Sequence, residues 1–161
     1  QPLDSWDVSN VIYMNTMFRG CNDFDQPLDS WNVSNVTRMN GMFYDATSFD
    51  QPLNLWDVSS VTNMNNMFYS ATSFNQPLDS WDFSSVTSIL NFMNGKSSAN
   101  YNASYYDDLL IKWDNAVGGL VFANMTDVNI EMGTIKYTSA GATARASLVS
   151  KGFIITDGGQ I

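Results

Sequence analysis

The chain has 161 residues, a net charge of −9 and an apolar fraction of 44%, but only 14% of its residues are charged. This acidic balance, with no basic stripe, excludes nucleic acid and disfavours an anionic membrane surface as partners. Histidine is absent and cysteine occurs once, which excludes histidine-based triads and histidine or cysteine metal sites. No apolar run approaches the length of a membrane span, so we expect no membrane insertion. We also expect no cofactor.

A 25-residue unit occurs four times without insertion or deletion. Each unit opens with Gln-Pro-Leu, and its tryptophan recurs as Trp6, Trp31, Trp56 and Trp81. A fixed period of this length is typical of units that bury their apolar sides against one another. We therefore predict an α/β repeat solenoid, leucine-rich-repeat-like, with coils at 1–25, 26–50, 51–75 and 76–95. Residues 96–161 are expected to form a small α+β cap.

Within one coil, the spacing of apolar residues predicts a strand and then a helix. Trp31 and Val33 are two residues apart, so they share one face of an extended segment and Asn32 points away. Ser34-Asn35 is a candidate helix N-cap. The apolar residues that follow lie at helical spacing and predict a helix of about two turns; they are Val36, Met39, Met42 and Phe43.

The 25-residue period is lost after Lys96, and the predicted elements change. Ser104 to Asp107 resembles a capping box, and Tyr106, Leu110, Trp113 and Val117 continue at helical spacing until Gly118-Gly119. Short strands are expected at 120–123 and 153–156, with an apolar run at 130–137 that Gly133 interrupts. A second helix is expected at 140–150, with Leu148 and Val149 facing inward.

The repeat pattern resembles a known family. The string W-D-V-S-x-V-T-x-M-x-x-M-F-x-x-A-x-x-F-x-Q-P-L covers residues 1 to about 93 and is similar to the BspA-like leucine-rich repeats of the Mycoplasma-lipoprotein type. The departures are mild, with Phe83 in place of valine and Ile89, Leu90 and Phe92 altering the methionine pattern. The resemblance implies a bacterial or microbial-eukaryote surface protein, of a class often suspected of adhesion.

Two columns of acidic and amide side chains recur once per coil, and together we call them the binding face. The first column is Asp4, Asp29, Asn54 and Asp79, and the second is Asp7, Asn32, Asp57 and Asp82. Asp7, Asp57 and Asp82 are weak candidates for a calcium site, because carboxylate and amide oxygens suit that ion. The simpler interpretation is that each aspartate accepts hydrogen bonds within its own turn.

The first coil has no predicted lid on its outer side. The residues that would form this assembly edge are Trp6, Val8, Val11 and Met14. Because the chain opens inside a repeat and has no signal peptide, we expect a mature product or an excised fragment. Three situations would explain this edge. The preceding coils were removed, the first coil is frayed, or another subunit covers the edge in a contact that propagates head to tail.

One cysteine and four asparagines bear on redox chemistry and on N-glycosylation. Cys21 falls in a column with Ala46 and Ala71, which predicts a small buried side chain. Four N-glycosylation sequons begin at Asn32, Asn35, Asn102 and Asn124, about as many as chance predicts in a chain this rich in Asn, Ser and Thr.

These observations favour a non-enzymatic module that is extracellular or at the cell surface and acts by adhesion through its repeat face. Its partner would be a protein or glycan on another surface. The alternative is a structural subunit that binds copies of itself head to tail through the uncapped first coil. A second alternative is an acid-based hydrolase that uses aspartates or Glu131. We expect no enzyme, because the acids follow the repeat period.

Overall fold

The computed structural model describes residues 2–115, 125–126 and 129–161. The predicted fold class, a four-coil α/β solenoid with a cap, is wrong. The described residues form two helices, α1 (Ala103–Asp114) and α2 (Ser139–Ser150), and two strands, β1 (Asn129–Glu131) and β2 (Ile154–Thr156). The strands pair in parallel as an open two-stranded sheet, with Ile130 opposite Ile155. The predicted helices and strands of the repeats are absent, because residues 2–100 form turns and isolated bridges.

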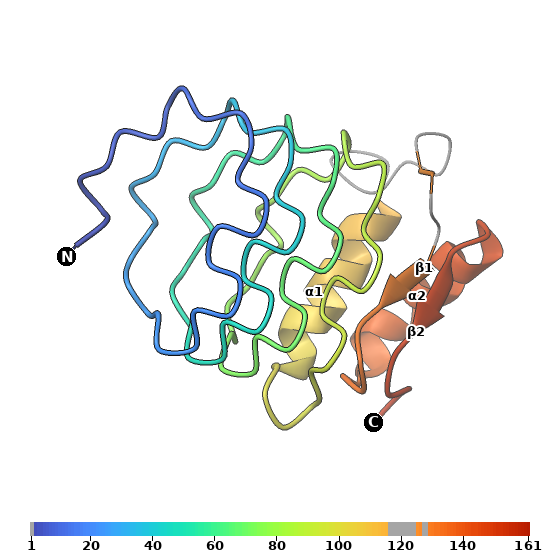
Figure 1. The fold of residues 1–161 in the computed structure, drawn as a ribbon. Coiled ribbons are helices and arrows are strands. Elements are labelled where there is room, and N and C mark those ends of the chain that lie inside the picture. The colour runs from blue at the N-terminus through green and yellow to red at the C-terminus, as the bar shows by residue number, and fades with distance from the viewer. Residues whose placement is uncertain (1, 116–124, 127–128) are drawn as a thin grey trace.

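The repeats nevertheless lie side by side in sequence register (Figure 1). Isolated parallel bridges join Tyr13 to Arg38, Arg38 to Asn63, and Asn63 to Ser88. Each bridge connects residues 25 positions apart, so each repeat contacts the next at equivalent residues. The backbone therefore forms hydrogen bonds between repeats, in addition to the turn bonds within each repeat.

These bonds explain why the apolar spacing did not produce a helix. The N–H groups of Met39, Gly41 and Phe43 donate to the carbonyls of the third repeat at Asn63, Asn65 and Met67, at 2.8–3.0 Å. In a helix each N–H would donate four residues back along its own segment. Left-handed backbone at Gly41 (φ 63°) and Asp45 (φ 55°) also interrupts the segment. The N–H groups in the segments that begin at Met14 and at Met64 donate to carbonyls of the next repeat in the same way.

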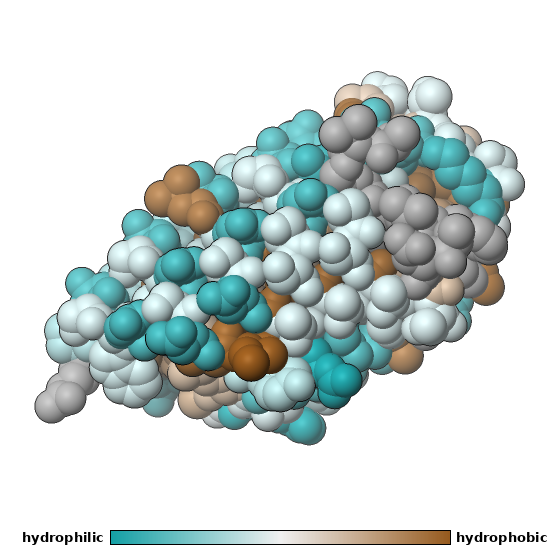
Figure 2. All heavy atoms as spheres, turned by 90° about the horizontal axis from the view of Figure 1, so that it is seen from above, coloured by the Kyte–Doolittle hydropathy of each residue, from teal (hydrophilic) through white to brown (hydrophobic). Residues whose placement is uncertain are grey.

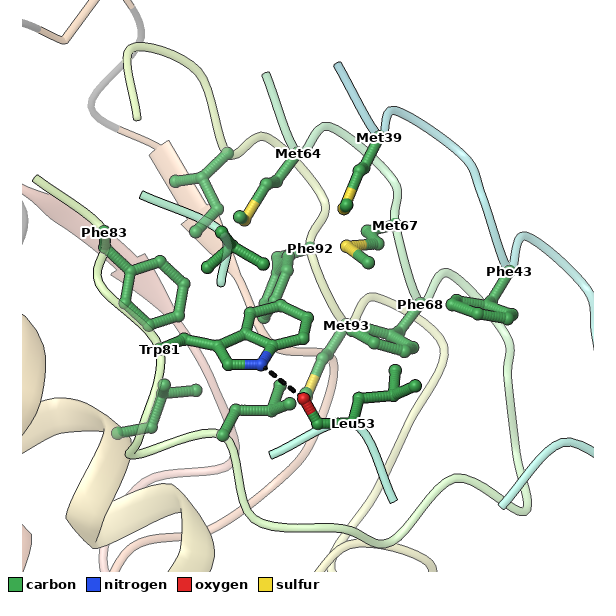
Figure 3. Close-up of a cluster of buried hydrophobic side chains, with 14 of the residues drawn as sticks. Met39, Phe43, Leu53, Met64, Met67, Phe68, Trp81, Phe83, Phe92 and Met93 are labelled. Carbon is green, nitrogen blue, oxygen red and sulfur yellow. Dashed lines mark hydrogen bonds between the residues drawn. The ribbon is translucent and has the colours of Figure 1, made fainter. Parts of the chain in front are cut away.

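The core follows the columns that the sequence predicts. Trp31, Trp56 and Trp81 are buried, and Trp56 and Trp81 stack with ring centroids 6.4 Å apart. Phe43 and Phe68 stack at 5.5 Å, and Figure 3 shows these rings in one cluster with Met64, Met67 and Trp81. The predicted alternation is confirmed, since Trp31 and Val33 are buried and Asn32 is exposed. The tryptophans of the second to fourth repeats are therefore core residues.

The C-terminal helices lie near the positions predicted from the sequence but differ from the prediction in detail. Helix α1 begins two residues earlier than the capping box implied, with Asn102 as its N-cap, and it buries Tyr106, Leu110 and Trp113. Helix α2 buries Leu148, but Val149 is 46% exposed, so its predicted inward orientation is wrong. The expected continuation through Val117 and Gly118-Gly119 and the strand at 120–123 lie outside the described residues.

The C-terminal segment attaches to the fourth repeat, and to the last residue of the third, by hydrogen bonds. Met93 N–H donates to Glu131 O in β1 (3.2 Å), and Asn102 N–H donates to Asn75 Oδ1 (2.8 Å). The Trp113 ring packs edge-on against Phe83, with centroids 5.8 Å apart. Gly133, at φ 64°, lets the chain pass so close that a Cβ there would lie 2.3 Å from Lys96 O. The apolar end of the fourth repeat is thus covered.

Candidate functional site

The binding face lies on the turns that connect the buried columns. Asp4, Asp7, Asp29, Asn32, Asn54, Asp57 and Asp79 are exposed, and Asp82 is partly exposed. Each position except Asp4, which follows the partly buried Leu3, precedes or follows a buried leucine, tryptophan or valine, so the core holds the turns and the polar side chains point outward. The structure thus brings the two predicted columns to the surface of neighbouring repeats.

The second column is fixed by bonds within each turn. Asp7 Oδ1 accepts from the Ser9 hydroxyl (2.6 Å) and from Ser9 N–H (3.0 Å), and Asp57 makes the same two bonds with Ser59. These bonds, the side-chain bond first, lower the pKa of both carboxyl groups, so both stay ionised at neutral pH. Asn32 and Asp82 accept from Ser34 N–H and Ser84 N–H in the same way.

This geometry matches the simpler interpretation of the aspartates, in which each holds its own turn. Within residues 2–115, 125–126 and 129–161, no group of three acidic, cysteine or histidine side chains is placed to hold a metal ion. Asp7, Asp57 and Asp82 each belong to a separate turn. The carboxylates are therefore arranged as a row of acceptors along the repeats.

At its C-terminal end, the binding face meets a shallow, open hollow against helix α1. Asp79, Asp108, Ile111, Lys112 and Asn115 line it. Burial, then the nearby carboxylates of Asp79 and Asp107, raise the pKa of Asp108. The sequence did not indicate this hollow, because Asp79 and Asp108 come together only when α1 packs beside the fourth repeat.

The first repeat presents a surface that differs from the equivalent surface of the others. Trp6 is 51% exposed and Met17 is 39% exposed, whereas their equivalents in the later repeats are 0–3% exposed. Ile12 and Tyr13 are also exposed. Among the predicted edge residues, Val8 and Met14 are buried against the second repeat and Val11 is partly buried. We call the exposed set of Trp6, Ile12, Tyr13 and Met17 the open edge.

Cys21 belongs to this end of the molecule as well. It is exposed, although Ala46 and Ala71 in the same column are fully buried. The prediction of a buried thiol is therefore wrong for the described residues, in which Ala46 and Ala71 follow an earlier repeat and Cys21 lies in the first one. Sequence equivalence between repeats could not reveal this difference at the end of the stack.

The family model for "Mycoplasma protein of unknown function, DUF285" matches residues 1–106. The chain belongs to this DUF285 family. No curated protein and no solved structure matches it. The matched region contains all four repeats, the complete binding face and the open edge, so both surfaces lie in the part that defines DUF285 membership.

The remaining predicted positions have mixed environments. Asn32, Asn35 and Asn102 of the sequons are exposed, and Asn124 lies outside the described residues. Glu131 is partly buried in β1, where Asn94 Nδ2 donates to its Oε2 (2.8 Å). Across the described part of the chain, no helix is long and apolar enough to cross a membrane. The face of the molecule that Figure 2 shows is mostly hydrophilic, and apolar residues form small groups on it.

Proposed function

We propose that the chain is a non-enzymatic interaction module, extracellular or at the cell surface, that adheres to a protein or glycan through the binding face. The observation that carries this proposal is the double row of exposed Asp and Asn side chains at equivalent positions of four stacked repeats. Hydrogen bonds with Ser9 and Ser59 hold two of these carboxylates in place. Fixed acceptors lose little conformational entropy on binding, which favours recognition.

The resemblance to BspA-like surface repeats supports the same proposal. Acceptor rows of this kind suit partners that offer several donors at regular spacing, such as sugar hydroxyls or the lysine and arginine side chains of a protein. Binding to a cationic protein surface would weaken as salt rises, because exposed charges are screened. Binding to neutral glycan hydroxyls would depend much less on salt.

The test is binding of the purified chain to a glycan array and to immobilised basic proteins at several salt concentrations. Asp29→Lys reverses a charge on the binding face, and Asp23→Lys makes the same charge change at an exposed residue outside it. We expect Asp29→Lys to abolish binding and Asp23→Lys to retain it, with both variants folded. Equal loss in both variants, or no binding to either surface, would refute the proposal.

A second candidate function is favoured by the open edge. Exposed Trp6 and Met17 are the equivalents of core residues in every other repeat, as expected for a subunit that assembles through this edge. Light scattering over a range of concentrations tests assembly. Growth that Met17→Lys blocks supports it, and a constant mass near 17.9 kDa argues against it.

A further inference from the structure

The repeats carry two arginines that have no acidic partner. Residues 1–95 contain ten aspartates but only two basic residues, Arg19 and Arg38. Across the part of the chain that the structure describes, neither arginine forms an ion pair. Each guanidinium lies over a tyrosine ring instead: that of Arg19 is 4.4 Å from the centroid of Tyr44, and that of Arg38 is 5.6 Å from the centroid of Tyr13.

One of these tyrosines belongs to a stacked column. Tyr44 and Tyr69 stack with ring centroids 4.5 Å apart and planes 5° from parallel. Arg19 belongs to the repeat before Tyr44, and Tyr69 to the repeat after it, so the three side chains form one column across three repeats. Stacking on an aromatic ring restricts the rotamers of a guanidinium, and its N–H donors then lose little entropy when they bind a ligand.

This surface runs along the side of the stack, so its exposure does not arise from an end. Arg38 and Tyr44 belong to the second repeat and Tyr69 to the third, and each has a repeat on both sides, yet all three are partly exposed. Met39 and Phe43, beside them in the chain, are buried. We call the outward set the arginine–tyrosine face; its residues are Tyr13, Arg19, Arg38, Tyr44 and Tyr69.

Asparagines lie between the two arginine positions. Asn40 and Asn65 occupy one column between the columns of Arg38 and Tyr44, and both are partly exposed. Asn65 Oδ1 accepts from Leu90 N–H (2.7 Å), which fixes the orientation of this amide. Guanidinium groups bind carboxylates through two parallel bonds, and amide and phenol groups bond to hydroxyls. The face therefore combines groups that suit a carboxylate with groups that suit sugar hydroxyls.

We propose that the arginine–tyrosine face binds a short oligosaccharide that contains acidic sugars. Arg19 and Arg38 each donate two hydrogen bonds to a sugar carboxylate. The sugar hydroxyls bond to Tyr44, Tyr69 and Asn40. The ligand is short because a long polyanion is repelled by a net charge of −9. This site is separate from the binding face, whose own carboxylates would repel such a ligand.

Isothermal titration calorimetry with a tetramer of galacturonic acid tests the proposal, and the methyl ester of the tetramer is the matched neutral control. We expect the acid form to bind and its binding to weaken as salt rises, because the charges are exposed. The ester should bind about tenfold or more weakly, since it cannot form the charged bonds. An aspartate tetrapeptide, which offers carboxylates without sugar hydroxyls, should also bind more weakly than the acid tetramer.

Matched variants locate the site. Arg19→Gln and Arg38→Gln should each weaken binding of the acid tetramer about tenfold, with the fold retained by circular dichroism. Lys136→Gln removes the same charge at an exposed residue outside the face and should keep binding, as should Asp29→Lys on the binding face. No binding of the acid tetramer, equal binding of the ester, unchanged binding in the arginine variants, or equal loss in Lys136→Gln would overturn the inference. Equal binding of the aspartate peptide would identify an acidic peptide as the ligand class and would also overturn it.

Discussion

At the scale of single residues, one position of the repeat has left-handed backbone in all four repeats. Thr16 (φ 54°), Gly41 (φ 63°), Asn66 (φ 56°) and Asn91 (φ 54°) are equivalent residues. Glycine and asparagine tolerate this conformation, but a β-branched residue is strained in it. The strain at Thr16 is therefore a cost that the other three repeats avoid.

We expect Thr16→Asn to raise the free energy of unfolding by about 1 kcal/mol, because it relieves this strain. The reverse change in an equivalent position, Asn66→Thr, should lower it by a similar amount. Urea unfolding of both variants measures the two effects. If the two variants shift stability in the same direction, the strain argument does not hold.

Leu55 is a second residue at which one repeat departs from the others. Ser30 and Ser80 occupy the equivalent position and donate their hydroxyls to the backbone carbonyls of Asp4 and Asn54, at 2.9 and 2.8 Å. Leu55 cannot donate such a bond and is 71% exposed.

Leu55→Ser is expected to restore a bond to the carbonyl of Asp29 and to raise the free energy of unfolding by about 0.5–1 kcal/mol. Ser80→Ala removes the corresponding bond and should lower stability. Thermal unfolding of both variants provides the measurement. A less stable Leu55→Ser variant would show that the leucine contributes packing that outweighs the bond.

At the scale of elements, the N-terminus of helix α1 is bonded to the repeats through one residue. Asn102 Oδ1 caps the helix by accepting from Ser104 N–H (2.9 Å), and Asn102 N–H donates to Asn75 Oδ1 (2.8 Å). Asn102 therefore both caps helix α1 and attaches it to the repeats.

Replacing the cap tests its contribution. Asn102→Ala should lower the free energy of unfolding by about 1 kcal/mol, because Ser104 N–H loses its acceptor. Asn102→Ser keeps a capping oxygen and should restore most of the loss, as measured by circular dichroism during urea unfolding. No difference between the alanine and serine variants would exclude a capping role.

The repeat elements show where sequence reasoning succeeded and where it failed. The spacing of Val36, Met39, Met42 and Phe43 identified buried residues correctly, since all four are buried. The same spacing misled about conformation, because a helix is only one way to bury such residues. Stacking lets the N–H groups of Met39 and its neighbours bond to the next repeat, and only knowledge of the neighbour reveals that alternative.

At the scale of the whole molecule, Lys96 lies where the repeats meet the C-terminal segment. It occupies the column of Ala46 and Ala71, is only 2% exposed, and its Nζ donates to Ala71 O (2.6 Å). Burial lowers the pKa of Lys96 from 10.5 to about 8, although Asp50 opposes the shift. Folding thus disfavours the charged form of this side chain.

This shift predicts how stability changes with pH. Between pH 8 and 10 the unfolded chain binds more protons at Lys96 than the folded chain does, so the free energy of unfolding should rise, by up to about 2 kcal/mol from this group. Above pH 10 the buried Tyr101 and Tyr106, whose pKa values burial raises, act in the opposite direction.

Lys96→Met should remove the rise between pH 8 and 10 and make the chain more stable at pH 7. Urea unfolding at intervals of half a pH unit compares the variant with the parent chain. A rise that persists in Lys96→Met would assign the effect to another group.

By itself the sequence determined the repeat period, the buried columns, the composition of the binding face and the approximate place of both C-terminal helices. These properties follow from side-chain type and spacing, which the chain displays directly. The tertiary structure decided the backbone conformation of the repeats, the exposure of Cys21 and the hollow between Asp79 and Asp108. Each of these depends on which segment lies alongside, because neighbouring backbone and side chains supply the hydrogen bonds and the cover that local sequence cannot specify.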